Sequence, residues 1–259
     1  MRIATWNVNS VKQRLDHLVG FLEKEAPDVL CLQEIKCTEE AFPRMEVEAA
    51  GYNLALLGQK GFNGVGILSK APLEDVRRGL PGFEDEQSRY IEGVISTPKG
   101  VVRVASIYLP NGNPVAAKYE YKLAFMDRLA AHARALLALE EPLVLAGDYN
   151  VIPEPRDVHD PAAWAEDALF LPETRARFRG ILNLGFGDAV RLCDDSAGLY
   201  TFWDYQAGAW QRNRGIRIDH LLLSPQAADR LRGASIHKYT RALDKPSDHV
   251  PVSVELDLG

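Results

Sequence analysis

Cysteine is scarce in this chain. The 259 residues contain three cysteines, Cys31, Cys37 and Cys193, an odd number without the paired spacing of a zinc site. Neither a disulfide framework nor a metal held by thiolates fits this pattern, so we expect a protein of a reducing compartment.

Long apolar runs are missing as well. The most apolar stretch, residues 136–147, is interrupted by Glu140, Glu141 and Pro142, and it is well short of the roughly 20 residues that a membrane helix requires. The start of the sequence, MRIATWNVNS, holds no apolar run of signal-peptide length. We therefore expect a cytoplasmic protein with no membrane partner.

Positive charge is in short supply, but it is unevenly distributed. The net charge of −6 argues at first against a polyanionic ligand. Residues 202–249, however, carry eight Lys and Arg against five Asp. The densest part is QRNRGIR, in which Arg212, Arg214 and Arg217 have no acidic neighbour. On charge alone, a solvated loop explains this cluster as well as a binding surface does.

Short apolar segments alternate with helical patterns along the chain. Residues 2–7 and 29–33 are expected strands, and the helix between them should start at the capping-box pattern of Ser10 and Gln13. A long helix is expected over residues 113–139, because Asn113 and Pro114 can form its first turn. Further strands are expected at 52–57, 64–69, 90–96, 101–109, 143–147, 201–203, 216–223, 234–239 and 250–256, and short helices at 176–184 and 226–231. No low-complexity linker divides the chain, so residues 1–259 are predicted to form a single α/β domain.

Polar residues recur where the expected strands end or begin, and one more, Asp219, lies within the expected strand 216–223. Burying such a group costs about 1 to 3 kcal/mol unless it is paired, so the repetition indicates one shared site. Residues two apart on an extended segment face the same side, which lets each such pair address one ligand. The residues concerned are Asn7 and Asn9, Glu34, Asp148 and Asn150, Asp219, and Asp248 with His249.

The types of these residues limit the chemistry. Glu34, Asp148 and Asp248 offer hard oxygen ligands, which suit magnesium or manganese. A divalent ion beside neutral or cationic donors favours phosphoester hydrolysis, because negative charge grows on the phosphorus oxygens during attack by water. No GxxxxGK[ST] phosphate loop and no GxSxG elbow is present, which argues against a nucleotide-hydrolysing loop or a serine hydrolase.

Six motifs, TWNVNS, LQEIK, SIYLPNG, GDYN, RIDHLL and SDHVPV, occur in this order over nearly the whole chain. Together they closely resemble the exonuclease III branch of the endonuclease/exonuclease/phosphatase superfamily. The resemblance implies a four-layer α/β sandwich of the deoxyribonuclease I type, with two β-sheets packed face to face and flanked by helices. It also implies a monomeric, magnesium-dependent DNA repair nuclease, with manganese as the alternative metal. Such enzymes cut duplex DNA 5′ to an abasic site and leave a 3′-hydroxyl, and many also degrade or trim DNA from 3′ ends.

The resemblance assigns roles residue by residue. Glu34 would be the principal metal ligand, with Asn7 and Asp248 beside it. Asp148 would deprotonate the attacking water, and Asn150 would hold that water or a phosphate oxygen. Tyr108 and His249 would donate to the phosphate, with His249 oriented by Asp219. Whether one or two metals act stays open, because Asp148, Asn150 and His249 could also approach a second ion.

The same resemblance suggests the DNA-binding residues. Phe202, Ile216 and Ile218 would surround a flipped-out abasic sugar, with Trp203 beside them, and an intact nucleotide would be too large for this slot. Asn111 matches a phosphate-contacting position. Residues 113 and 114 depart from relatives that place an inserting arginine there, which puts the strength of product retention in doubt.

Other interpretations compete with these. Asn7 and Asn9 could cap a helix, and the apolar residues assigned to the slot would ordinarily be core. Asp157, His159 and Asp160 in PRDVHDP are metal-ligand types, but in a proline-rich loop such residues are more often turn-forming. His220 and His237 are expected to be structural. At the level of function, the rivals are hydrolysis of a lipid or inositol phosphoester and a non-catalytic DNA-binding relative.

Overall fold

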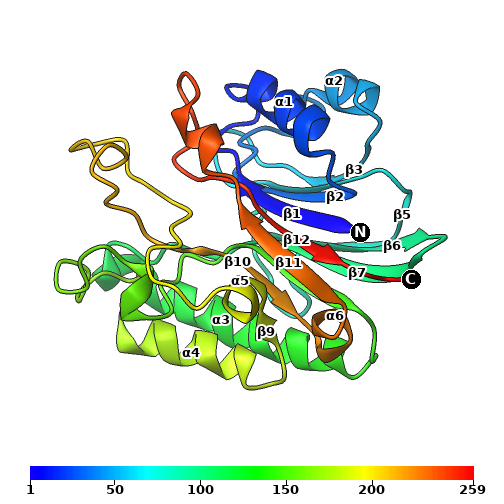
Figure 1. Cartoon of the computed structure of the whole chain (residues 1–259). Helices are drawn as coiled ribbons and strands as arrows, with labels where there is room; N and C mark the ends of the chain where they lie inside the picture. The colour runs from blue at the N-terminus through cyan, green and yellow to red at the C-terminus, as the bar shows by residue number, and fades with distance from the viewer.

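Two six-stranded β-sheets lie face to face at the centre of the computed structural model, which describes residues 1–259 (Figure 1). From edge to edge, the first sheet consists of β11 (Leu231–Ile236), β12 (Val252–Leu256), β1 (Arg2–Asn7), β2 (Val29–Gln33), β4 (Val65–Ser69) and β3 (Asn53–Leu57). The second consists of β5 (Leu73–Arg78), β6 (Tyr90–Thr97), β7 (Gly100–Tyr108), β8 (Leu143–Asp148), β10 (Asp219–Leu223) and β9 (Gly187–Asp188).

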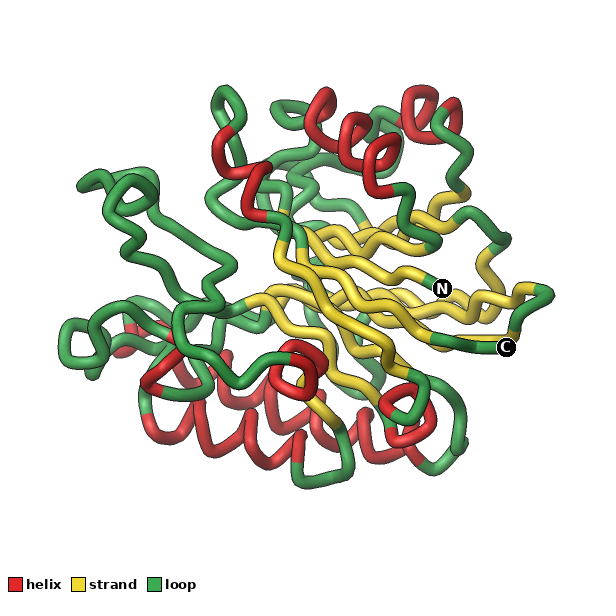
Figure 2. Tube along the Cα trace, in the orientation of Figure 1, coloured by secondary structure: helices red, strands yellow, loops and turns green.

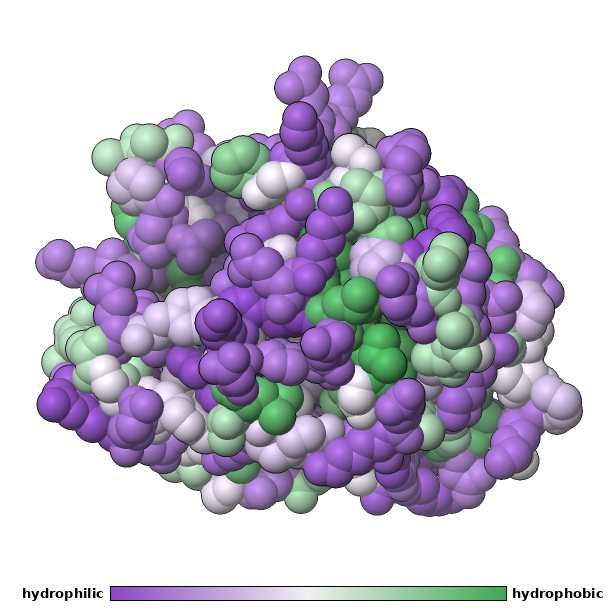
Figure 3. Space-filling model, turned by 90° about the horizontal axis from the view of Figure 1, so that it is seen from above, coloured by the Kyte–Doolittle hydropathy of each residue, from purple (hydrophilic) through white to green (hydrophobic).

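Helices cover both outer faces of the pair of sheets. α1 (Leu15–Glu25) and α2 (Arg44–Ala49) pack on the first sheet, and α3 (Val115–Leu137) and α4 (Pro172–Leu182) pack on the second (Figure 1). The shorter elements are η1 (Pro155–Asp157), α5 (Ala189–Cys193), α6 (Pro225–Ala228) and η2 (Lys238–Ala242). This arrangement confirms the expected four-layer sandwich. None of the helices combines the length and apolar character needed to span a bilayer. The face seen in Figure 3 is mostly hydrophilic, with its hydrophobic residues in small groups.

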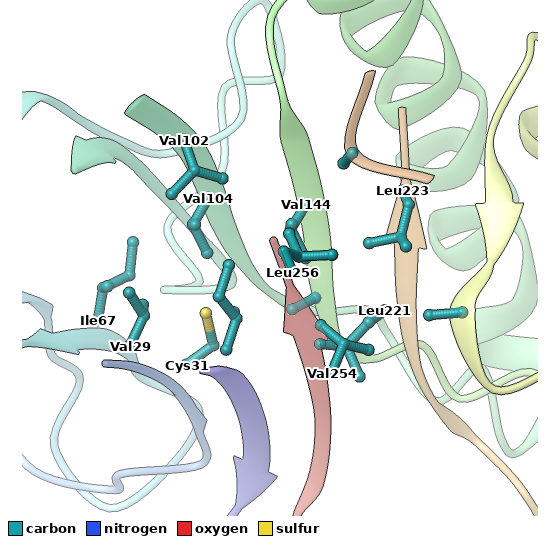
Figure 4. Packing of buried hydrophobic residues seen from close by; sticks show 14 of the residues in the cluster. Val29, Cys31, Ile67, Val102, Val104, Val144, Leu221, Leu223, Val254 and Leu256 are labelled. Atoms are coloured by element: carbon teal, nitrogen blue, oxygen red, sulfur yellow. The ribbon is translucent and has the colours of Figure 1, made fainter. Parts of the chain in front are cut away.

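The core between the sheets follows from the alternation of side chains along each strand. On β2, Val29 and Cys31 point into the inter-sheet layer, whereas Leu30 and Leu32 point outward to the helices. Figure 4 shows side chains of both sheets meeting in this layer, among them Val104 and Val254. Because both faces of the central strands are covered, these strands appear in the sequence as continuous apolar runs.

The topology brings functional strand ends to one place. β1 and β2 are parallel, as are β7 and β8, and each pair is joined by a helix, α1 or α3. The carboxyl ends of parallel neighbours meet at the same edge. Figures 1 and 2 show long loops gathered at one end of the sheets, away from the two chain termini. The sandwich therefore presents strand ends and loops together at one end.

The first helix begins later than the sequence predicts. α1 starts at Leu15, and its preceding residue, Arg14, makes no side-chain capping bond. The backbone N–H groups of Ser10 and Val11 instead donate to the carbonyls of Glu34 and of the residue after it. These bonds tie the start of the chain to the segment after β2, so the capping-box pattern at Ser10 is not used to start a helix.

Other boundaries also differ from expectation. Residues 201–203 form isolated bridges through Phe202 rather than a strand, and β10 begins at Asp219 rather than at residue 216. α4 starts at Pro172, earlier than expected, because proline is well suited to the first helical turn. β5 was not predicted, since its sequence LEDVRR is mostly polar and exposed.

Candidate active site

Strand register sets the positions of the central polar residues. In the second sheet, Tyr108 on β7 and Asp219 on β10 both stand directly beside Asp148 on β8. In the first sheet, Asn7 ends β1 and Glu34 directly follows β2. The polar residues that the sequence placed at strand ends thus converge at one end of the sandwich.

Asn7 joins the two sheets at this end. Its side-chain amide is buried and donates to Oε1 of Glu34 at 2.8 Å and to Oδ2 of Asp148 at 2.9 Å. Its side-chain oxygen Oδ1 accepts the backbone N–H of Asn9 at 3.0 Å. Asn7 therefore does not cap a helix, and it holds two carboxylates from different sheets near each other.

Glu34 is held in an uncommon backbone conformation. Its φ is +50°, in the left-handed region, and that of Asn150 is +47°. Non-glycine residues in this region are uncommon and often occur at functional sites. Burial favours the neutral carboxyl of Glu34, but the ammonium of Lys36, 3.0 Å away, and the amide of Asn7 outweigh it. These partners hold the pKa of Glu34 below its usual value, so Glu34 is anionic.

Asp148 is the most strongly perturbed carboxyl of the site. It is 1% exposed, and its Oδ1 accepts the backbone N–H of Asn150 at 3.0 Å. Burial raises the pKa of Asp148 to about 7, with a further contribution from the like charges of Asp219 and Glu34, while His249 opposes the shift. A carboxyl poised near neutral pH is suited to accept a proton from water.

His249 lies between two aspartates. Its Nδ1 is 2.8 Å from Oδ2 of Asp219, and its Nε2 is 3.6 Å from Oδ2 of Asp148. Burial alone would lower the pKa of His249, but Asp219 and Asp148 raise it to about 10. Asp219 is fixed in turn by the Thr201 hydroxyl, which donates to it at 2.6 Å. His249 is therefore cationic at neutral pH.

Neutral donors complete the site. Burial and the charges of Glu34 and Asp148 raise the pKa of Tyr108 well above its usual value, so its phenol stays protonated and can donate. The side-chain amide of Asn150 donates to the carbonyl of Leu109 at 2.9 Å. Asn111 donates to Oδ1 of Asn150 at 3.3 Å. Asn111 lies in the loop after β7 and Asn150 in the loop after β8, and these hydrogen bonds link the two loops.

The donor set fits a hard divalent cation. Ligand atoms of Asp148, Asp219 and His249 lie within 4.8 Å of one another. Asp248 is close to Asn9, whose amide donates to its Oδ1 at 3.2 Å. Carboxylate and amide oxygens are the ligands that magnesium and manganese prefer, so the chemistry of these side chains suits either ion.

A pocket of about 310 Å³ opens beside these groups, lined by Glu34, Asp148 and His249. Its lining also includes Phe202, Ile216 and Ile218, the residues that the sequence assigned to a slot. The ring of Phe202 packs edge-on against that of His249, with centroids 5.0 Å apart. The apolar wall and the polar groups thus belong to one pocket.

Three further lining residues of the pocket were not predicted from the sequence. Trp164 and Leu169, from the loop between η1 and α4, also line the pocket, as does Asp167. The available signal was a tryptophan within a loop rich in proline and aspartate, where a large apolar side chain has no strand or helix to pack on. Lys36 and Thr201 were missed too, because each acts on another side chain rather than by standing at a strand end.

Two predicted DNA contacts are wrong. Trp203 is fully buried in a small apolar cluster with Tyr200 and Val250, and it does not line the pocket. Arg217 is 1% exposed, and its guanidinium donates to Asp157 at 2.7 Å and to Asp188 at 2.8 Å. Side chains on successive residues of an extended segment point to opposite sides, so Arg217 faces inward while its isoleucine neighbours face the pocket.

Among the remaining residues that the sequence singled out, some are exposed on loops and others are fully buried. Arg212 and Arg214 are exposed on the loop before the pocket residues, and Asn111 is exposed beside the site. Asp157, interpreted from the sequence as a turn-forming residue, is fully buried in the ion pair with Arg217. His220 is also fully buried, and burial lowers its pKa to about 4.

Comparisons with known proteins agree with this geometry. Residues 4–249 match the model of the Endonuclease/Exonuclease/phosphatase family. The chain is 34% identical to exodeoxyribonuclease III of Haemophilus influenzae, over 98% of this chain and 99% of that protein. It is similar to the 3′ phosphatase NExo from Neisseria, solved with a product DNA hairpin (TM-score 0.95, 37% identity, 99% of both chains). It is also similar to an AP endonuclease from Archaeoglobus fulgidus (TM-score 0.94, 36% identity, 99% of both chains). The chain therefore belongs to the endonuclease/exonuclease/phosphatase family.

Proposed function

We propose that the protein is a metal-dependent DNA repair nuclease that hydrolyses the phosphodiester 5′ to an abasic site and leaves a 3′-hydroxyl. We include 3′-to-5′ exonuclease and 3′-end trimming activity on duplex DNA in this proposal. The observation that carries it is the shared pocket, in which Phe202 packs against His249 and faces the carboxyls of Glu34 and Asp148. A hydrolytic centre and an apolar recess large enough for a sugar share one opening.

The proposed metal is magnesium, with manganese as the alternative. Glu34, Asn7 and Asp248 would hold it, and Asp148, Asn150 and His249 are near enough to interact with the same region. When bound, the ion would neutralise the developing charge on the phosphate oxygens. The fit of hard oxygen donors to this ion supports the choice.

Each protein group then has a defined task. Asp148 accepts the proton of the attacking water, since its pKa of about 7 matches a general base at neutral pH. His249 is cationic and Tyr108 is protonated, so both can donate to phosphate oxygens. Asp219 keeps the imidazole oriented through its bond to Nδ1. Asn150 orients the water or a phosphate oxygen beside Asp148.

Pocket size would select the substrate. Phe202, Ile216 and Ile218 offer no hydrogen-bonding groups from their side chains, and an extrahelical sugar without a base would fit among them. An abasic nucleotide is also the cheapest to extrude from the duplex, because it has no pairing or stacking to lose.

Double-stranded DNA as the partner is supported by the relatives. The Neisseria neighbour was solved with a DNA hairpin, and the Archaeoglobus neighbour is named as an AP endonuclease. Arg212 and Arg214 are exposed on the loop that precedes Ile216 in the chain and would contact phosphates. A monomeric state and a cytoplasmic location stay predictions from the sequence.

The test uses a 5′-labelled duplex with one tetrahydrofuran abasic analogue, incubated with magnesium or with chelator. We expect a single cut 5′ to the analogue that requires metal. Asp148→Asn is the matched control, because loss of a general base costs about 10² to 10⁴-fold in rate but leaves the shape of the pocket intact. Cleavage of an inositol or lipid phosphoester with no cut in this duplex would favour the phosphatase alternative. DNA binding without any cut would favour the non-catalytic one.

A further inference from the structure

Lys122 on α3 is fully buried close to the candidate active site. Its ammonium donates to the backbone carbonyl of Asn150 at 2.5 Å and to that of Asn111 at 3.0 Å. It forms no salt bridge within 4.0 Å, and lysine is almost never fully buried unless it is paired. A buried lysine with only carbonyl partners requires an explanation.

Burying a charged group is costly unless it is paired and hydrogen-bonded, and Lys122 has hydrogen bonds to two carbonyls but no ion pair. An apolar side chain would avoid that cost but would leave the two carbonyls without their donor. Burial lowers the pKa of Lys122 to about 7, while the charges of Asp148 and Asp167 oppose that shift. The position therefore keeps an amine at a cost to folding.

The two carbonyls belong to Asn111 and Asn150, whose side-chain amides are proposed to contact phosphate or the attacking water. Asn111 follows β7, Asn150 follows β8, and the Asn111 side chain donates to Oδ1 of Asn150. Asn150 also donates its backbone N–H to Oδ1 of Asp148 at 3.0 Å. A shift of either carbonyl would therefore move groups that surround the proposed base.

The loop is shaped around the stem of this lysine. Gly112 has a φ of +89°, and a Cβ there would lie 2.6 Å from Cδ of Lys122 and 3.0 Å from Cβ of Ala168. The backbone at Gly112 thus lies directly on the lysine side chain. Lys122 and the Asn111 loop form one packed unit.

We propose that Lys122 is a positioning residue, whose amine holds the carbonyls of Asn111 and Asn150 at a fixed separation and so aligns their side-chain amides with Asp148. The inference rests on the proposed nuclease function. It predicts a defect chiefly in the chemical step, because Lys122 is fully buried and acts only through the backbone carbonyls of Asn111 and Asn150.

The experiment compares the single-turnover rate and the KM for the tetrahydrofuran duplex in four proteins at saturating magnesium: wild type, Lys122→Met, Lys122→Arg and Leu129→Ala. Methionine keeps the unbranched stem of the side chain as far as Cε without its donors, and arginine restores donors to both carbonyls. Leu129 lies on the same helix in the apolar core and is the control for general destabilisation. Each protein is measured below its own Tm, and the rate is corrected for the folded fraction measured by circular dichroism.

We expect Lys122→Met to lose at least about tenfold in the rate of the chemical step with KM within about threefold, since small misplacements of reacting groups can cost up to about 10²-fold. Lys122→Arg should recover most of that loss, and Leu129→Ala should lower the Tm but keep the rate. If Lys122→Met does not fold, Lys122→Gln, which is too short to span both carbonyls, is measured instead with the same expected loss.

Three outcomes would overturn the proposal: a Lys122→Met rate within twofold of wild type, an equal loss in Leu129→Ala, or an arginine variant as slow as the methionine variant. Failure of the proposed function would look different, because wild-type protein itself would then leave the duplex uncut.

Discussion

Asp219 orients the imidazole of His249, because its carboxylate lies 2.8 Å from Nδ1. The carboxylate of Asp219 in turn accepts a hydrogen bond from the hydroxyl of Thr201. Burial alone would lower the pKa of His249, so its value of about 10 depends on Asp219 and Asp148. A histidine whose pKa rises from 6.5 to about 10 on folding contributes stability fully below pH 6.5 and loses it as the pH rises through about 10.

Asp219→Asn should therefore lower the pKa of His249 and move the alkaline limb of the pH–rate profile to lower pH. We expect a rate loss of about 10² or more at neutral pH that shrinks as the pH is lowered, because acid restores the imidazolium. Single-turnover rates from mildly acidic to alkaline pH measure this. The exposed Asp229→Asn is the control, and an unmoved alkaline limb would contradict the assignment.

Asp148 should set the acid limb of the same profile. A base whose pKa is raised to about 7 is active above that value, so kcat/KM should fall about tenfold per pH unit below it. A nearby divalent cation favours the carboxylate, so raising the magnesium concentration should shift this limb to lower pH. pH–rate profiles at low and at saturating magnesium test the shift. An acid limb that does not move with the magnesium concentration would show that Asp148 does not interact with the ion.

Glu34→Gln should weaken metal binding. The change replaces a charged hard ligand with a neutral one, and we expect the magnesium concentration for half-maximal rate to rise at least about tenfold. Glu40→Gln, on the exposed segment after Glu34, is the control with the same change of charge. An unchanged titration in Glu34→Gln would place the ion elsewhere.

DNA binding should divide between a charged loop and an apolar wall. Arg212→Ala with Arg214→Ala should weaken binding to undamaged and abasic duplex alike, and each lost phosphate contact should flatten the salt slope by about 0.9. Phe202→Ala should instead reduce the preference for abasic DNA. At physiological salt the screening length is about 8 Å, so distant acidic groups have little effect on this surface.

Both sets of variants are measured on both duplexes across a salt series. An arginine pair that affects only abasic binding, or that leaves the salt slope unchanged, would refute this division.

Arg217 should matter for folding rather than for DNA. Its guanidinium is buried between Asp157 and Asp188, so Arg217→Met leaves both carboxylates without this partner. Removing one member of a buried ion pair typically costs about 3 to 5 kcal/mol, which urea unfolding would detect. The salt slope of DNA binding should not change in this variant. A loss below about 1 kcal/mol would mean that the network contributes little.

Much of the fold and site could be predicted because apolar strands that end in polar residues leave a clear pattern. Asn7 and Asp148 each end a strand as expected, whereas Asp219, expected within a strand, is the first residue of β10 and pairs with Asp148. The strands buried on both faces were visible as apolar runs for the same physical reason.

What could not be predicted depends on contacts between distant segments. Arg217 looked like a surface cation because its partners, Asp157 and Asp188, are 60 and 29 residues away in sequence. Ser10 carries a helix-capping pattern, but hydrogen bonds to the segment after β2 outweigh that local preference. Trp164 reaches the pocket from a loop without periodicity, so no pattern indicated its side.

Two of the hydrogen bonds at the proposed reaction centre cross from one sheet to the other. Asn7 belongs to the first sheet and binds Asp148 of the second, and His249, next to β12, binds Asp219 of β10. The thickness of the apolar layer that contains Cys31 and Val144 therefore acts as a spacer for the reacting groups. A larger side chain in that layer would increase the distance between Asp148 and the imidazolium of His249. The reaction therefore constrains the choice of core residues as much as folding does.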